Sequence, residues 1–227
     1  MPSNSYPLIA REGWPVLGLL LGLFLVLQYL EYHLAVTTLL LGIIFLAVFL
    51  HRDPFQQIPP LPLAVVSPVH GTVMSVLEIR DPFLDRPALC IRIKMRPWDI
   101  FSLRSPIEGK VMNQWSRSDT VDRLIKTSYA FWIQSDEGDH VVTSIHLNKP
   151  RWRYHFYMQS GQRLGQGQRC GFLYFGTEVE VMVPLEVKLE IETGQRVCSG
   201  ATPLALLVHE EAVSAFDGPN RSSQASA

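Results

Sequence analysis

The stretch that decides the fold is Ser67-Pro68-Val69-His70-Gly71-Thr72-Val73-Met74, because its pattern returns later in the chain as Ser105-Pro106-Ile107-Glu108-Gly109-Lys110-Val111-Met112. In each copy a Pro-x-x-Gly turn leads into an apolar segment of the kind that forms a strand. With only two copies, the repetition indicates internal pseudo-symmetry and not a solenoid. We therefore expect related turn-and-strand units on two sides of one domain.

A second pair of glycine turns supports the same interpretation. Gly161-Gln162-Arg163 with Gly167 is repeated as Gly194-Gln195-Arg196 with Gly200. Between residues 63 and 208 the apolar residues occur in short runs separated by Gly, Pro, Asn or Asp, which is typical of short strands. The sequence thus predicts a mainly β chain, with a barrel-sandwich-like β domain over residues 63–208.

The apolar residues near the amino terminus follow another pattern. From Trp14 to Leu50 the only acidic or potentially basic side chains are Glu31 and His33, which divide the run into two halves. Each half is near the short end of what crosses a hydrocarbon core as a helix. We expect a two-helix transmembrane hairpin over residues 14–50; two helices buried in a core are the alternative.

Flanking charges give this hairpin an orientation. Arg11 precedes it and Arg52 follows it, whereas the central turn has no Lys or Arg. The positive-inside rule then predicts a multi-pass protein of the cell (inner) membrane whose β domain faces the cytoplasm. We expect residues 1–13 to be an N-terminal tail, residues 51–62 a proline-containing linker, and residues 209–227 a disordered tail.

Composition excludes some classes of function. A net charge of −1 gives no reason to expect nucleic acid as a partner. The three cysteines, Cys90, Cys170 and Cys198, are widely spaced and contain no Cys-x-x-Cys pair. This spacing is typical of unbridged thiols in a reducing compartment, and it predicts no metal site.

A pair of residues within Phe175-Gly176-Thr177 could carry chemistry. A hydroxyl directly after a flexible glycine can attack the preceding carbonyl, because glycine accepts the strained turn that the attack requires. The following alternation of Glu178 and Glu180 with valines predicts a half-buried strand. A turn glycine followed by a β-favouring threonine, with no reaction, is the alternative interpretation.

The order of several landmarks resembles the short, membrane-anchored type of the phosphatidylserine decarboxylase family from Arg11 to about Leu207. These landmarks are Arg11-Glu12-Gly13-Trp14-Pro15, Arg52-Asp53-Pro54, Ser67-Pro68-x-x-Gly71, Pro97-x-Asp99, Ser105-Pro106-x-x-Gly109, Phe175-Gly176-Thr177 and Pro184-Leu185. No single landmark is specific to the family; the series is.

The resemblance implies self-processing. Members of the family cut themselves at a Gly-Ser bond and leave a pyruvoyl group, which condenses with the substrate amine and serves as an electron sink when carbon dioxide leaves. It also implies a carboxylate from a Ser-Pro-x-Asp-Gly motif and an imidazole from an Asp-x-His motif for proton transfer. By this resemblance Gly176, Thr177, His70 and Asp99 are the expected catalytic positions.

Three of the family's reactive groups are replaced in this chain. Thr177 stands in place of the serine, His70 in place of the carboxylate, and Phe101 in place of the imidazole, whereas Asp99 and Arg104 are kept. By the same resemblance, Thr177 would be converted into a self-generated 2-oxobutanoyl group. We expect no bound cofactor. We expect His70 to act as a neutral base. Phe101 cannot transfer a proton, so one of three other histidines could replace it: His140, His146 or His155.

A basic and aromatic segment around Arg151 and Arg153 suits an anionic headgroup, and these two arginines are the predicted substrate-binding residues. An ordinary strand with exposed cations is the alternative for this segment. The expected partner is membrane phospholipid, with further copies of this chain as an open alternative.

Two functions from different classes follow from the sequence. The resemblance implies a carboxy-lyase that converts phosphatidylserine to phosphatidylethanolamine, and the replacements leave an inactive phospholipid-binding or scaffold homologue as the alternative. A biotinyl or lipoyl carrier fits less well, because neither Lys110 nor Lys188 has the position of an acceptor at a hairpin tip. An adaptor of an export pump would need a long coiled coil, which the sequence lacks.

Overall fold

A computed structural model describes residues 9–54, 56–61, 63–121, 124–147, 154–174 and 177–208. Most of the predicted N-terminal tail (1–13) and all of the predicted tail 209–227 lie outside these residues. Two helices, α1 (Gly13–Tyr29) and α2 (Leu34–Leu50), come first. The strands then follow in the order β1 (Ala64–Val66), β2 (Gly71–Arg80), β3 (Pro87–Lys94), β4 (Ser102–Arg104), β5 (Gly109–Val121), β6 (Leu124–Gln134), β7 (His140–Leu147), β8 (Tyr154–Phe156), β9 (Arg163–Leu164), β10 (Arg169–Leu173), β11 (Glu178–Val183), β12 (Val187–Leu189), β13 (Arg196–Val197) and β14 (Pro203–Leu207).

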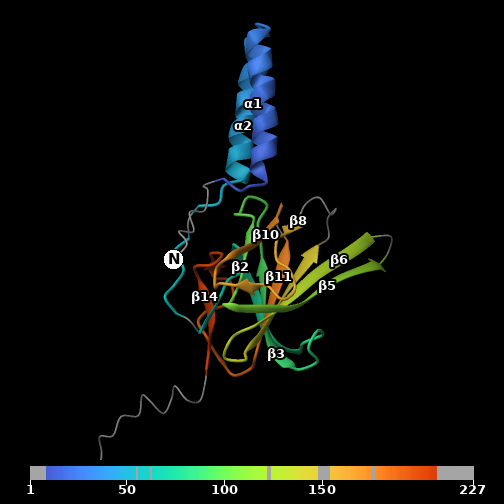
Figure 1. Cartoon of the computed structure of the whole chain (residues 1–227), viewed down its shortest axis with the longest axis vertical. Coiled ribbons are helices and arrows are strands. Elements are labelled where there is room, and N and C mark those ends of the chain that lie inside the picture. The colour runs from blue at the N-terminus through green and yellow to red at the C-terminus, as the bar shows by residue number, and fades with distance from the viewer. Residues whose placement is uncertain are drawn as a thin grey trace, which may run out of the picture.

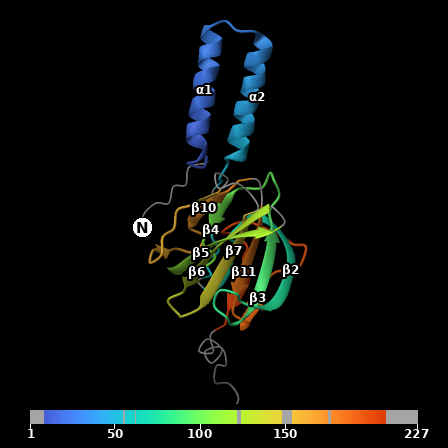
Figure 2. The same ribbon diagram turned by 90° about the vertical axis from the view of Figure 1, so that its right-hand side faces the viewer.

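The strands make one large sheet and two small ones. The large sheet has eight strands in the order β13-β2-β3-β11-β7-β6-β5-β9, and the small sheets have the orders β1-β14-β12 and β4-β10-β8. Figures 1 and 2 show that the large sheet curls and that the other strands close around it, with the two helices standing side by side at one end. The chain is therefore mainly β in its described part.

The repeated sequence units adopt the same local structure. Ser67 Oγ donates to the carbonyl of Val69, and Ser105 Oγ donates to that of Ile107, both at 2.7 Å. The second pair of turns docks on these units in the same way, because the N–H groups of Gly194 and Gly161 donate to the carbonyls of Val73 and Val111, at 2.8 and 2.7 Å. The pseudo-symmetry predicted from the sequence is thus present in the fold.

Neither glycine of the repeated Pro-x-x-Gly turns has room for a side chain, and a Cβ on Gly109 would collide with the carbonyl oxygen of Gln134. A Cβ on Gly71 would lie 2.6 Å from the carbonyl oxygen of Lys94 on the neighbouring strand. In the later turn pair, Gly161 and Gly194 have φ angles of 87° and 89°, which L side chains rarely adopt. Both types of turn therefore need glycine, the Pro-x-x-Gly turns because there is no space for a Cβ and the later turns because φ is positive.

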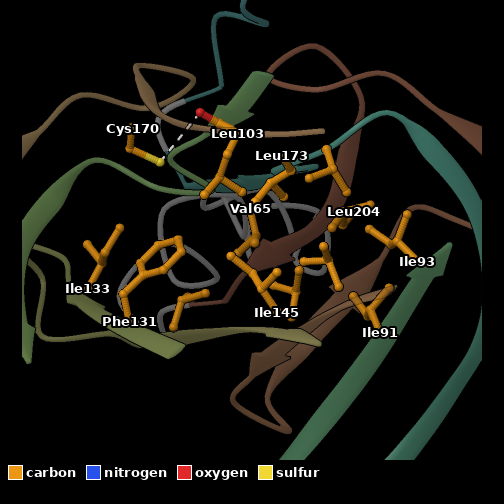
Figure 3. Close-up of a cluster of buried hydrophobic side chains, with 14 of the residues drawn as sticks. Val65, Ile91, Ile93, Leu103, Phe131, Ile133, Ile145, Cys170, Leu173 and Leu204 are labelled. Carbon is orange, nitrogen blue, oxygen red and sulfur yellow. Dashed lines mark hydrogen bonds between the residues drawn. The ribbon is translucent and has the colours of Figure 1, made fainter. Parts of the chain in front are cut away.

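The main core lies inside the curled sheet. It includes Val179, Val181 and Val183 of β11, together with aromatic and branched side chains from both small sheets. Figure 3 shows Phe131, Ile133 and Ile145 facing Val65, Leu173 and Leu204 across this interior. The opposite face of β11 carries Glu178, Glu180 and Met182, so the side chains alternate as the sequence predicts. The prediction of a half-buried strand is wrong, because only Glu178 is exposed and Met182 packs in a second apolar cluster.

The prediction of a transmembrane hairpin is wrong. Each helix has 17 residues, which at 1.5 Å per residue gives about 26 Å, less than the roughly 30 Å of a hydrocarbon core. Within the described part of the chain, no helix has both the length and the apolar character needed to cross a membrane. This finding also overturns the predicted multi-pass localisation.

The alternative of two core helices does not describe these helices either. Both expose large apolar side chains, and Leu19 and Phe45 are 71% and 68% exposed. Among their residues only Gly13, Thr37, Leu40 and Ala47 are buried. The helices form a hairpin that touches the β domain mainly at its base (Figure 2).

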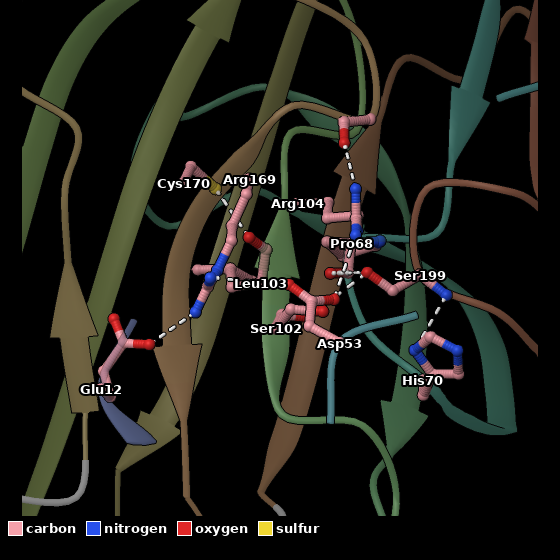
Figure 4. A network of polar contacts seen from close by, with 11 residues as sticks. Glu12, Asp53, Pro68, His70, Ser102, Leu103, Arg104, Arg169, Cys170 and Ser199 are labelled. Atoms are coloured by element: carbon pink, nitrogen blue, oxygen red, sulfur yellow. Dashed lines mark hydrogen bonds and ion pairs between the residues drawn. The ribbon is translucent and has the colours of Figure 1, made fainter. Parts of the chain in front are cut away.

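A buried ionic network fastens this base to the β domain (Figure 4). Asp53 accepts a hydrogen bond from Arg104 at 3.1 Å, and both side chains are only 1% exposed. Arg169 lies 3.5 Å from the other carboxylate oxygen of Asp53 and 2.6 Å from Glu12. The network joins residues on both sides of the helices to β4 and β10.

Replacing Asp53 with Asn is expected to destabilise the protein strongly. Removing one charge from a buried pair leaves the other uncompensated, which costs about 3–5 kcal/mol. The free energy of unfolding, measured in urea, is expected to fall by this amount. The matched control is Asp85→Asn, because the Arg80–Asp85 pair is exposed on both sides and such pairs contribute little. Equal effects of the two substitutions would contradict this account of the network.

Candidate active site

The ends of neighbouring strands bring predicted catalytic positions together at one edge of the large sheet. This edge is the one at which β2 and β11 begin and β3 ends. Lys94, the last residue of β3, pairs with Thr72 of β2 on one side and with Glu178 of β11 on the other. His70 directly precedes β2, and Thr177 directly precedes β11. Adjacent strands are about 4.8 Å apart, so the backbones of residues 70 and 177 flank the same end of β3.

Thr177 is held on two sides at this edge. Its hydroxyl donates to the carbonyl of His146 at the end of β7. Its own carbonyl accepts the N–H of Met95 at 3.0 Å. Thr177 is partly exposed, whereas the predicted partner Gly176 lies outside the described residues, as does Phe175.

His70 is buried and its ring has a defined hydrogen-bonding role. The N–H of Ser199 donates to Nδ1 of His70 at 3.3 Å, as Figure 4 shows. Burial lowers the pKa of His70 to about 4, although the nearby Asp99 carboxylate opposes this shift. A neutral ring whose Nδ1 accepts a bond carries its proton on Nε2. Near neutral pH, His70 therefore presents an N–H donor, which does not suit the role of base that the sequence suggested.

Asp99 lies beside His70 and is itself buried. One carboxylate oxygen accepts the backbone N–H of Arg96 at 2.9 Å, and the other lies 2.8 Å from the guanidinium of Arg196. These two contacts hold the carboxylate in the loop between β3 and β4. The structure thus brings Asp99 and His70 into one cluster.

Phe101 belongs to an aromatic cluster in the core. Its ring centroid lies 5.9 Å from that of Phe172 and 6.1 Å from that of Tyr174. An imidazole, His51, belongs to the same cluster, because its ring stacks on Phe172 at 6.1 Å. No pattern in the sequence singles out His51 or Tyr174, although His51 adjoins the Arg52-Asp53-Pro54 landmark.

The three histidines proposed as replacements for the lost imidazole lie in different places. His140 pairs with Gln134 at the opposite end of β7 and accepts a hydrogen bond from Trp132. His155 is exposed on β8. Only His146 reaches Thr177, and it does so through its backbone, while its ring lies 3.2 Å from Glu180.

The ring of His146 is engaged in an ionic cluster on the outer face of the sheet. Glu180 lies 2.7 Å from Arg92 as well as close to His146. The hydrogen bond with Glu180 raises the pKa of His146, against the effect of burial. The predicted substrate-binding residues, Arg151 and Arg153, lie outside the described residues.

Comparison with known proteins matches nearly the whole chain to one family. A family description, "Phosphatidylserine decarboxylase", matches residues 44–205. A phosphatidylserine decarboxylase proenzyme of Nitrosomonas europaea is 32% identical over 211 residues, covering 90% of this chain and 97% of that protein. Proteins of the same name from Nitrosomonas eutropha and Symbiobacterium thermophilum are 33% and 32% identical, covering 89% and 91% of this chain and 98% and 99% of their own.

The lowered pKa of His70 predicts a pH-dependent stability. The unfolded chain protonates this ring near pH 6.5 and the folded chain only near pH 4, so the unfolded state binds more protons between these values. The contribution of His70 to the free energy of unfolding is therefore full above pH 6.5 and is lost as the pH falls toward 4.

The variant His70→Asn is the matched control, since its amide oxygen can still accept the N–H of Ser199. Urea unfolding between pH 4 and 7 is expected to show a steeper loss of stability for the original chain than for this variant. Parallel curves would show that His70 titrates normally in the folded protein.

Proposed function

Because the chain belongs to the phosphatidylserine decarboxylase family, we propose that it cuts itself between Gly176 and Thr177 and then decarboxylates phosphatidylserine to phosphatidylethanolamine. The observation that carries this proposal is the position of Thr177, a hydroxyl residue directly before β11 and at the same sheet edge as His70 and its neighbour Asp99. The relatives' name, proenzyme, accords with a chain that is processed.

The cleavage step needs only groups of the chain. Oγ of Thr177 loses its proton and attacks the carbonyl carbon of Gly176, and the bond from that carbon to the amide nitrogen of Thr177 breaks as the nitrogen gains a proton. The product is an ester between the two residues. Hydrogen-bond donors that face the developing negative oxygen would speed this attack, and the Nε2–H of His70 is of that type.

Elimination then separates the two chains. The α-proton of Thr177 is removed, the bond between Cβ and the ester oxygen breaks, and Gly176 leaves as a carboxylate. Rearrangement and addition of water release ammonia and leave a 2-oxobutanoyl group on residue 177. The extra methyl group, compared with pyruvoyl, adds bulk next to the ketone.

The residues around Thr177 fit such a group. The N–H of Met95 donates to the carbonyl of Thr177 at 3.0 Å, and in the product this carbonyl adjoins the ketone and keeps its donor. The N–H of Met95 thus holds the new terminus at this edge of the sheet, and it withdraws electron density from the carbonyl next to the ketone. The keto group supplies an acceptor for the substrate amine and for the electron pair left by carbon dioxide.

Intact-mass measurement of freshly purified protein tests this proposal. We expect two chains, residues 1–176 and 177–227, with the second lighter than its unmodified sequence by one ammonia. Thr177→Ala should remain uncut, because it has no attacking oxygen, and Thr177→Ser should be cut faster, because it lacks the methyl group. A single uncut species of the original chain, with no ketone that an amine and borohydride can trap, would overturn the proposal.

A second function, phospholipid binding without turnover, has one observation in its favour. Phe101 offers no proton-transfer group and packs against Phe172 and Tyr174 in the core. General acid–base groups each contribute typically about 10²- to 10⁴-fold in rate, so a site without them could retain the lipid and not react with it.

This second function gives its own prediction for Arg151 and Arg153. An uncut protein is expected to bind vesicles that contain phosphatidylserine, since the two cations attract anionic headgroups with about 1 kcal/mol each. The double variant Arg151→Ala, Arg153→Ala should weaken co-sedimentation with these vesicles roughly tenfold or more by the same arithmetic. Substitution of Arg80, a cation on β2 paired with Asp85, is the control. Undiminished binding by the double variant would argue against this function.

A further inference from the structure

A row of polar side chains crosses the outer face of the large sheet at the edge where Thr177 lies. Arg196 of β13 pairs with Thr72 of β2, and Thr72 pairs with Lys94 of β3. Lys94 in turn pairs with Glu178 of β11, and Figure 2 shows β2, β3 and β11 side by side. Directly paired residues point to the same face of a sheet. The four side chains therefore form one polar row across adjacent strands.

The polar row faces solvent and not the core. Neighbours in the sequence point the other way and are buried in the main core: Val73, Ile93 and Val197. The side chains of Arg196 and Lys94 are each 57% exposed, and Thr72 between them is partly exposed. A ligand can therefore reach all three side chains from solution.

Both cations of the row keep hydrogen-bond donors for an anion. One nitrogen of Arg196 donates to the buried carboxylate of Asp99 at 2.8 Å, but a guanidinium has five N–H donors in all. The ammonium of Lys94 lies 3.8 Å from Glu178, which is too far for a hydrogen bond. Because both side chains are long, they can converge on one anion above the hydroxyl of Thr72. Glu178 would repel an anion on the far side of Lys94.

The polar row adjoins the position of the proposed keto group. Lys94 directly precedes Met95, whose N–H donates to the carbonyl of Thr177. Arg196 holds Asp99, one of the expected catalytic positions. The keto group would form at Cα of Thr177, a backbone atom of a partly exposed residue at the end of a strand. A ligand on the outer face can therefore extend to this atom around the edge of the sheet.

Phosphatidylserine carries two anionic groups close to its amine, a phosphate and a carboxylate. The carboxylate loses its charge as carbon dioxide forms, so a cation bound to it would stabilise the substrate more than the transition state. The phosphate keeps its charge throughout, and cations bound there hold the substrate without opposing the reaction. Two cations beside the site therefore suit the phosphate better.

We propose that Arg196 and Lys94 bind the phosphate of the lipid headgroup above Thr72 and so place its amine at residue 177. The inference rests on the proposed function, for which it names the residues that hold the substrate. Both cations are positioning residues in this scheme, because they take no part in proton transfer.

Lipid binding by the full-length variant Thr177→Ala tests this inference, because no turnover then disturbs the measurement. The probes are dihexanoyl phosphatidylserine and dihexanoyl phosphatidylethanolamine, titrated as monomers by calorimetry. Adding Lys94→Gln or Arg196→Gln to this variant is expected to weaken binding of both lipids about fivefold, the effect of one cation close to an anionic lipid. Both lipids should respond, because both contain the phosphate.

The matched control is Arg80→Gln, because Arg80 is an exposed cation at the other end of β2. Lys94→Gln leaves every contact of Asp99 in place, so it tests the row even if Arg196→Gln does not fold. Added salt should weaken binding less in Lys94→Gln than in the chain that keeps Lys94, since salt screens exposed charges. A purely structural role of Lys94 would leave this salt dependence unchanged.

Several outcomes would overturn the inference while the proposed function stands. They are the absence of binding by Thr177→Ala, undiminished binding of both lipids by Lys94→Gln, and a loss confined to phosphatidylserine, which would assign the carboxylate to these cations. Inorganic phosphate that binds as tightly as the lipids would show a general anion site and overturn it as well. If the original chain stays uncut but Lys94→Gln weakens binding of both lipids, the proposed function fails and the phosphate site stands.

Discussion

The register of β3 between β2 and β11 is the constraint on which the site depends. Lys94 pairs with Thr72 on one side and Glu178 on the other, so the residues that precede β2 and β11 meet at one edge. A slip of one residue would turn the valines of β11 out of the core and the glutamates into it. In that register the glutamates would lose their ion pairs with Arg92, Lys94 and His146. This cost and the loss of the valines from the core fix the register, and with it the position of Thr177 relative to His70.

The buried network of Asp53, Arg104, Arg169 and Glu12 adds a second constraint, because it fixes where α2 ends. His51 is two residues before Asp53 and so enters the core beside Phe172 and Tyr174. The segment after the helices therefore does more than connect them to the β domain. It supplies an imidazole to the aromatic cluster that contains Phe101.

The features predicted correctly from the sequence are those that depend on residues close together in the chain. Repeated turns and alternating valines were enough for the pseudo-symmetric β units and for the inward face of β11. The two helices lie where Glu31 and His33 divide the apolar run, but the inference that segments of this length cross a membrane failed, because apolar character alone does not decide it. The role of His70 could not be predicted, since the Ser199 N–H that occupies its ring comes from far along the chain. His51 was missed for the same reason: its partner, Tyr174, is distant in sequence.

Release of carbon dioxide tests the central claim most directly. Phosphatidylserine labelled in the serine carboxyl group would be given to the purified protein and to Thr177→Ala, and the labelled gas would be collected. We predict release by the original protein and none by the variant, because alanine at residue 177 has no hydroxyl from which the keto group could form. Absence of release by the folded original protein, or equal release by both, would contradict it.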